Sequence, residues 1–249
     1  MKILVANPNT STGVTDRLVA AGRLVASPGT DLLPMTAPRG VPYIATRAEA
    51  AIGSAVMLEM LAEKRGTFDA AICAAFGDPG LGGARELFDF PIVGMAEAAM
   101  LMACTLGRKF AIVSFAKALE PWFAEIVDWH GMSGRCAAIQ MLDSAFTNIN
   151  DVAEEKEQLL VDLANRVVTH NGADVVILAG APLAGLATKL RERVPVPLVD
   201  GIQAAVTMAE GLVRLNPRKA TLGTYSRPAA KASTGLGTAL ANVIGHNDA

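Results

Sequence analysis

Hydrophobic and polar residues alternate along the chain in blocks that predict strands and helices in turn. Two short runs are apolar almost throughout, which is typical of strands buried on both faces, and they span residues 69–75 and 174–180. Other stretches carry apolar residues four positions apart, which is the spacing of one helix face. These are Ile52, Val56 and Met60 in one stretch, and Leu159, Leu163 and Val167 in another. This alternation predicts an α/β fold with parallel sheets covered by helices.

The chain also contains an internal repeat. The apolar run that starts at residue 69 returns at residue 174, and Gly80-Leu81 returns at the same offset as Gly185-Leu186. The N-terminal run, residues 2–7, is matched by residues 109–114. A repeat of this length indicates a duplicated domain of roughly 100 residues and not a solenoid. We therefore expect two pseudo-symmetric halves, each with its own parallel sheet.

The repeat also suggests where the halves begin and end. We assign residues 1–100 together with 207–249 to the first half, and residues 101–206 to the second. The segment beyond about Gly211 has no counterpart in the repeat. We expect this tail to pack back on the first half.

Four loops leave the carboxyl ends of the predicted strands, which is where parallel sheets bind ligands. If the halves face each other, these loops surround one cleft between them. The residues that we expect to contact a ligand there are Asn7, Asn9, Thr10, Ala75, Phe76, Gly77, Ser114, Gly180, Ala181 and Pro182.

Asp78 is the ionisable side chain on these four loops, and it has two interpretations. As a functional residue it would be a catalytic acid or base, or an anchor for the substrate. As a structural residue it would cap a helix, because aspartate followed by proline, here Pro79, is typical of a helix start. Glu97 and His130 allow the same two interpretations, and Cys73 is expected to be buried and inert.

Composition narrows the class of protein. The chain has 249 residues, 51% of them hydrophobic, and a formal net charge of -2, which gives no basic footprint for nucleic acid. We find no apolar run long enough to span a membrane and no signal peptide. The three cysteines and three histidines show no spacing of a disulfide framework or a zinc site, so we expect a cytoplasmic protein without a metal.

Several of these segments together resemble the hydantoin racemase group of the aspartate/glutamate racemase superfamily. The segments that carry the resemblance are Asn7-Pro8-Asn9-Thr10-Ser11, Phe76-Gly77-Asp78-Pro79-Gly80-Leu81, Gly94-Met95-Ala96-Glu97-Ala98-Ala99, Ile112-Val113-Ser114 and Val176-Ile177-Leu178. The resemblance implies two Rossmann-like halves, a small-molecule substrate such as a hydantoin, allantoin or amino acid, and no cofactor. Together with apolar helix faces it also makes us expect a homo-oligomer.

The chain departs from the family pattern at its two most important positions. The resemblance implies a pair of cysteines that move protons on opposite faces of the substrate carbon. Here the first of these positions is Ala75 and the second is Gly180, and the internal repeat pairs the same two residues. Neither side chain can carry a proton, so the two-thiol racemisation is not expected.

Three kinds of function remain open at this point. The first is cofactor-independent carbon-acid chemistry on a small carboxylate, ureido or cyclic amide substrate, with Asp78 as the catalytic residue; lyase, decarboxylase and cis–trans isomerase reactions of the superfamily belong here. The second is a small-molecule binding protein without catalysis. The third is racemisation by other residues, such as His130 or Glu97.

Overall fold

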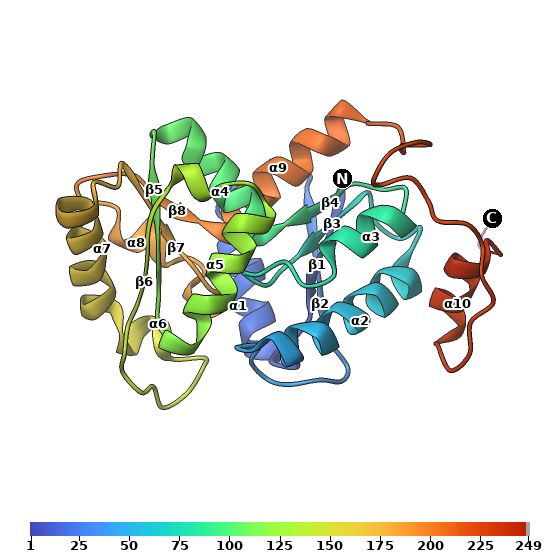
Figure 1. Cartoon of the computed structure of the whole chain (residues 1–249), viewed down its shortest axis with the longest axis horizontal. Helices are drawn as coiled ribbons and strands as arrows, with labels where there is room; N and C mark the ends of the chain where they lie inside the picture. The colour runs from blue at the N-terminus through green and yellow to red at the C-terminus, as the bar shows by residue number, and fades with distance from the viewer. Residues whose placement is uncertain (248–249) are drawn as a thin grey trace.

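The computed structural model describes residues 1–247, and its strands form two parallel four-stranded sheets. The order of strands in the first sheet is β2 (Asp31–Thr36), β1 (Lys2–Asn7), β3 (Ala70–Cys73) and β4 (Ile92–Gly94). The order in the second sheet is β6 (Cys136–Met141), β5 (Phe110–Ser114), β7 (Val175–Leu178) and β8 (Leu198–Asp200). The two orders are equivalent, which confirms the α/β fold and its two pseudo-symmetric halves (Figure 1).

The register of the sheets follows the sequence repeat residue by residue. In the first half Ile3 of β1 pairs with Ala70 of β3. In the second half Phe110 of β5 pairs with Val175 of β7, and these are the residues that the repeat matches to Ile3 and Ala70. Positions that the repeat equates beyond the ends of β3 and β7 therefore occupy equivalent places in the two halves.

Helices connect the strands and cover the sheets. They are α1 (Thr12–Arg23), α2 (Arg47–Lys64), α3 (Leu81–Leu87), α4 (Met95–Leu106), α5 (Glu120–Trp129), α6 (Val152–Glu155), α7 (Glu157–Asn171), α8 (Leu186–Leu190), α9 (Gly201–Leu215) and α10 (Thr238–Gly245). Short 3-10 helices span Lys117–Leu119 (η1), Ser133–Arg135 (η2) and Ala181–Leu183 (η3). No helix within residues 1–247 is long and apolar enough to cross a membrane.

Of the three residues predicted for each buried helix face, the second and third are buried and the first is exposed. Val56 and Met60 of α2 are buried, as are Leu163 and Val167 of α7. Ile52 and Leu159 are instead exposed by 44% and 46%. The same turns do reach the core through Gly53 of α2 and Leu160 of α7, which are buried, so Ile52 and Leu159 lie to the side of the buried face.

Helices α4 and α9 exchange places between the two halves. Helix α4 follows β4 of the first sheet but contacts β5, β7 and β8 of the second. Helix α9 follows β8 of the second sheet but contacts β1, β3 and β4 of the first, and it also contacts α4 (Figure 1). The boundaries proposed at residues 100 and 206 fall inside these helices, which join the two halves.

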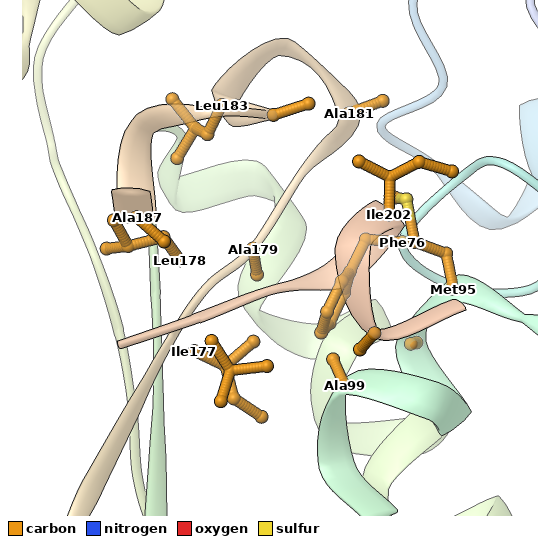
Figure 2. Close-up of a cluster of buried hydrophobic side chains, with 14 of the residues drawn as sticks. Phe76, Met95, Ala99, Ile177, Leu178, Ala179, Ala181, Leu183, Ala187 and Ile202 are labelled. Carbon is orange, nitrogen blue, oxygen red and sulfur yellow. The ribbon is translucent and has the colours of Figure 1, made fainter. Parts of the chain in front are cut away.

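The exchanged helices produce one continuous core across the molecule. Met95 and Ala99 of α4 and Ile202 of α9 lie in one buried cluster with Phe76 of the first half and Ile177 of the second (Figure 2). These side chains are exposed by 4% or less. The relative position of the two sheet ends is therefore fixed by apolar packing, which favours a single native arrangement.

The tail packs on the first half, as predicted. Helix α10 lies against α2, and Leu240 and Val243 are buried there (Figure 1). Between α9 and α10, Lys219 Nζ donates hydrogen bonds to the carbonyls of Arg85 and Glu86 near the end of α3.

Candidate functional site

A small cavity lies where the carboxyl ends of the two sheets meet. Its volume is about 30 Å³, enough for one or two water molecules. Residues from both halves line it: Asn9, Tyr43, Ile44, Ala75, Phe76, Phe115, Leu119, Trp122, Phe123, Gly180, Ala181 and Pro182. A ring-shaped ligand can enter only if some of these side chains move.

A larger groove of about 370 Å³ lies elsewhere, between residues 85–92 and 212–225. It is beside the residues that precede β4, at the amino end of that strand. Since parallel sheets bind ligands beyond their carboxyl ends, the smaller cavity between the halves is the better candidate for the functional site.

Six of the ten residues that the sequence suggested for ligand contact line this cavity. They are Asn9, Ala75, Phe76, Gly180, Ala181 and Pro182. The other four, Asn7, Thr10, Gly77 and Ser114, are not among its lining residues. Their side chains or backbones hold the surrounding loops in place.

Asn7 organises the loop after β1. Its amide nitrogen donates to Asn9 Oδ1 (3.0 Å), to the carbonyl of Ser11 (3.2 Å) and to Thr15 Oγ1 (3.0 Å). The Asn9 Oδ1 atom also accepts from the Ser11 backbone at 2.9 Å. Because the oxygen of the Asn9 amide is occupied by this loop, its nitrogen is the end that is available to the cavity.

Two further loop residues link segments at the cavity. The backbone N–H of Thr10 donates to the carbonyl of Val41 at 3.0 Å, which ties the loop after β1 to the segment that carries Tyr43. Ser114 is fully buried, and its hydroxyl donates to the carbonyl of Ala179 at 2.7 Å. This bond joins the ends of β5 and β7 directly below Gly180.

Ala75 and Gly180 both border the cavity, at equivalent places in the two halves. Gly180 has a backbone φ of +112°, a conformation that side chains rarely adopt. A Cβ at this position would lie 2.9 Å from Phe115 Cε1 and 3.5 Å from Ser114 Oγ. Both the backbone conformation and the position of Phe115 therefore favour glycine, which has no side chain, at residue 180.

The segment Gly77–Gly80 is a tight loop with several positive φ angles. Gly77 has φ +140°, Asp78 +47° and Gly80 +83°. A Cβ on Gly77 would lie 2.2 Å from the Trp122 ring, so glycine is needed for the close contact between this loop and α5. Aspartate is one of the residues that tolerate the left-handed region.

The Asp78 carboxylate caps α4. Its Oδ1 accepts from the Ala96 N–H and its Oδ2 from the Glu97 N–H, both at 2.9 Å. The side chain is fully buried, and Asp78 is not among the residues that line the cavity. A cap was one of the two interpretations of this residue, but the capped helix begins 17 residues further along the chain and not at the adjacent proline.

A chain of partly buried ionisable side chains extends from this cap. His130 Nε2 lies 3.1 Å from Asp78 Oδ2, and its Nδ1 lies 3.7 Å from Glu97 Oε1. Glu97 in turn pairs with Arg85 through two hydrogen bonds of 2.9 and 2.5 Å. His130 comes from the second half and the other three from the first, so these contacts link the two halves.

Cys73 is not among the residues that line the cavity either. It is buried beneath α2 and α3, and its thiol donates to the carbonyl of Pro79 at 3.4 Å. Burial, together with the negative charge of Asp78, raises the pKa of the Cys73 thiol well above its ordinary value. A thiol held protonated in this way is a poor nucleophile and a poor base.

Sequence reasoning missed the aromatic wall of the cavity. Tyr43, Phe115, Trp122 and Phe123 line it, and Phe76 contacts Phe123 with their ring centroids 4.9 Å apart. Tyr43 lies in the loop that follows β2, a strand that the sequence analysis did not identify, and Trp122 lies in the first turn of α5. The sequence did contain a usable signal. The capping box of Thr46 and Glu49 marks the start of α2, so the segment before it, which includes Tyr43, is outside the helix.

Charged groups are absent from the cavity lining. None of the twelve lining residues is Asp, Glu, Lys, Arg, His or Cys. Within residues 1–247, moreover, no group of three or more His, Cys, Asp or Glu side chains is placed to hold a metal ion. The polar side-chain groups of the lining residues are the Asn9 amide, the Tyr43 hydroxyl and the Trp122 indole N–H.

A family model and curated relatives all point to one protein family. The model of the Asp/Glu/hydantoin racemase family matches residues 3–209. Among curated proteins, the hydantoin racemase of Paenarthrobacter aurescens is 31% identical over 93% of this chain and 99% of its own length. The hydantoin racemase of Pseudomonas sp. (strain NS671) is 30% identical over 94% and 95%.

Solved structures agree with these relatives. The allantoin racemase from Klebsiella pneumoniae superimposes with a TM-score of 0.90 at 34% identity, covering 96% of this chain and 98% of that one. The allantoin racemase from Pseudomonas fluorescens gives a TM-score of 0.88 at 31% identity, covering 94% and 100%. Arylmalonate decarboxylase shares the fold at 18% identity, with a TM-score of 0.60 and coverage of 86% and 92%.

Proposed function

We propose a cofactor-independent activity on small neutral carbon acids for this chain, which belongs to the Asp/Glu/hydantoin racemase family. The substrate class that we propose is a cyclic amide or ureide with an apolar substituent, bound in the cavity between the sheets. The hydantoin and allantoin racemases among its relatives act, by their names, on cyclic ureides.

One observation carries the choice of substrate class, namely the uncharged lining of the cavity. A carboxylate that loses its water shell in such a site has no cation to pair with, and the cost of burying an unpaired charge is several kcal/mol or more. Amino acids and dicarboxylates are therefore disfavoured. A neutral ring can place its carbonyl oxygens against the Asn9 amide and the Tyr43 hydroxyl, and its substituent against the aromatic wall.

The proposed chemistry is the exchange of the proton on the carbon next to a ring carbonyl. The C–H bond breaks, the proton passes to water, and the electron pair spreads onto the carbonyl oxygen as an enolate. Hydrogen-bond donors aimed at that oxygen stabilise the charge. Water returns a proton to the same carbon, and the ring is regenerated in either configuration.

The two-thiol mechanism is not part of this proposal, because Ala75 and Gly180 stand at the two positions where the family resemblance places cysteines. The cavity lining also lacks a base, and this supports a second candidate function. In that candidate the chain binds the same neutral ligands without turning them over.

Proton NMR in D₂O distinguishes these functions. The panel is 5-benzylhydantoin, 5-methylhydantoin, allantoin and alanine, and the matched control variant is Ala75→Leu, which fills the cavity. We expect the wild type to exchange the ring C–H of at least one hydantoin or allantoin faster than buffer does, and Ala75→Leu to lose this activity. Alanine should not exchange.

Other results have clear meanings. Binding of a ring compound without exchange would favour the non-catalytic candidate. Exchange of alanine in preference to the rings would contradict the neutral substrate class. Neither binding nor exchange of any ring compound would contradict both candidate functions.

A further inference from the structure

The hydroxyl of Tyr43 is a buried hydrogen-bonding group with no partner in the part of the chain that the structure describes. Tyr43 lines the cavity between the two sheets. Buried polar groups are almost always hydrogen-bonded in native proteins, and one that is not lowers the stability of the fold. An unsatisfied hydroxyl at a candidate ligand site therefore needs a functional explanation.

Tyr43 is held in place by aromatic rings from the second half. Its ring lies 5.7 Å from Phe115 and 6.1 Å from Phe146, measured between centroids, and Phe115 and Phe146 lie 5.5 Å apart. These contacts fix the ring without offering its hydroxyl an acceptor. Tyr43 is thus pre-organised for a hydrogen bond that the protein itself does not complete.

The surroundings also decide the direction of that hydrogen bond. Burial, and then the negative charge of Glu49, raises the pKa of the Tyr43 phenol above its ordinary value. The phenol stays protonated at neutral pH and is a donor, not a base. A protonated donor in an apolar site stabilises a developing negative charge on a carbonyl oxygen more strongly than water does.

We propose that Tyr43 donates its hydroxyl hydrogen to a carbonyl oxygen of the bound ligand, which on the proposed function is a neutral cyclic amide or ureide. Asn9 supplies a second donor, since its amide oxygen is already occupied by Asn7 and Ser11. Two donors and no cation fit a ring with two carbonyl groups. Tyr43 thereby acts as a recognition residue for the uncharged form of the ligand.

Tyr43→Phe tests this assignment, with Tyr225→Phe as the matched control. Tyr225 is 36% exposed, lies beside Arg85, and does not line the cavity. Without ligand, Tyr43→Phe should melt at a higher temperature than the wild type, because the unsatisfied hydroxyl is gone. Its affinity for 5-benzylhydantoin, measured by calorimetry, should fall about tenfold, as expected for one lost hydrogen bond. Tyr225→Phe should not show this combination.

Fluorine NMR gives a readout that a merely structural residue would not move. The chain has two tyrosines, so protein labelled with 3-fluorotyrosine gives two resonances that the two variants assign. Addition of 5-benzylhydantoin should shift the Tyr43 resonance and leave that of Tyr225 in place.

The assignment and the proposed function fail in different ways. If Tyr43→Phe binds 5-benzylhydantoin as tightly as the wild type does, the role of Tyr43 is wrong while the substrate class stands. If the wild type does not bind the hydantoin, the proposed function is contradicted for that probe. In that case the ligand-free melting temperature still decides about Tyr43, since a lower value for Tyr43→Phe would show that its hydroxyl is already satisfied.

Discussion

The carboxylate of Asp78 occupies the space that a side chain on Gly94 would need, with its Oδ2 only 2.4 Å from where a Cβ would stand. In the second half the matching position is Asp200, which caps α9 from the strand end itself through Ile202 N and Gln203 N. Asp200 also accepts from the Gly185 N–H at 2.5 Å. Each exchanged helix therefore starts at a carboxylate that ties it to the loop after the third strand of its own half.

This relationship predicts that Asp78→Asn is first of all a stability variant. An amide can accept from one of the two N–H groups of α4 but places its own NH₂ against the other. We expect the free energy of unfolding to fall by about 1–2 kcal/mol, measured as a lower midpoint in urea at unchanged m-value. The matched control is Asp143→Asn on an exposed loop residue, which should change little. A variant as stable as the wild type would mean that the cap contributes nothing.

The close approach of Gly77 to Trp122 gives a second prediction. Gly77→Ala adds a Cβ that would lie 2.2 Å from the indole ring, on a backbone with φ +140°. We expect a loss of more than about 2 kcal/mol, together with a changed tryptophan emission because the ring must move. Gly211→Ala is the control, since Gly211 lies in α9 with open space around it, and alanine should stabilise that helix by about 0.5–1 kcal/mol. Normal emission and stability of Gly77→Ala would contradict the contact.

A third prediction concerns the two positions where cysteines are missing. Ala75→Cys should fold with nearly wild-type stability, because residue 75 has no positive φ and its side chain borders the cavity. Gly180→Cys should be less stable by about 1–3 kcal/mol, since it needs a side chain at φ +112° and within 2.9 Å of Phe115.

Gly180→Ala separates the effect of the Cβ, which both of these causes involve, from the effect of the thiol. If backbone strain and the Phe115 contact are responsible, the alanine variant should lose most of the same stability, measured by urea unfolding. Equal stability of Gly180→Ala and the wild type would show that the loop can accept a side chain. In that case the absence of the second thiol would not be built into the backbone.

The sequence predicted the sheets well because their signal is local and repeated. Buried parallel strands appear as apolar runs, and the match of residue 69 to residue 174 also placed Ala75 and Gly180 at equivalent strand ends. The exchange of α4 and α9 between halves could not be predicted in this way. It depends on packing between segments about 100 residues apart, such as Met95 against Gly201.

In the candidate site, too, some residues could be predicted from the sequence and others could not. Residues directly after strands, such as Asn9 and Ala75, were identified because the fold rule locates them. Tyr43 was missed because the strand before its loop, β2, was not recognised in the sequence, and Trp122 was missed because it lies within a helix, α5. For Asp78 the sequence indicated a cap or a functional carboxylate, and only the three-dimensional structure identifies α4 as the helix that it caps.

Glu210 gives a prediction for the pH dependence of stability. Glu210 is 4% exposed, and its carboxylate accepts hydrogen bonds from the Ser27 N–H (2.8 Å), the Ser27 hydroxyl (2.6 Å) and the Thr30 hydroxyl (2.6 Å), which ties α9 to the first half. Desolvation alone would raise its pKa, but these bonds and the charge of Arg214 outweigh it and lower the pKa to about 2.

A pKa that is lower in the folded state means that the unfolded chain binds the proton more readily. The carboxylate therefore stabilises the fold above pH 4.5, and this contribution is lost as the pH falls from about 4.5 toward 2. We expect Glu210→Gln to reduce the free energy of unfolding at pH 7 by up to about 3 kcal/mol, and the difference from the wild type to shrink between pH 4.5 and pH 3 in urea titrations. Glu192→Gln, at a side chain that is 86% exposed, is the control and should match the wild type throughout. A difference for Glu210→Gln that stays constant from pH 7 to pH 3 would show that the charge of Glu210 does not contribute to stability.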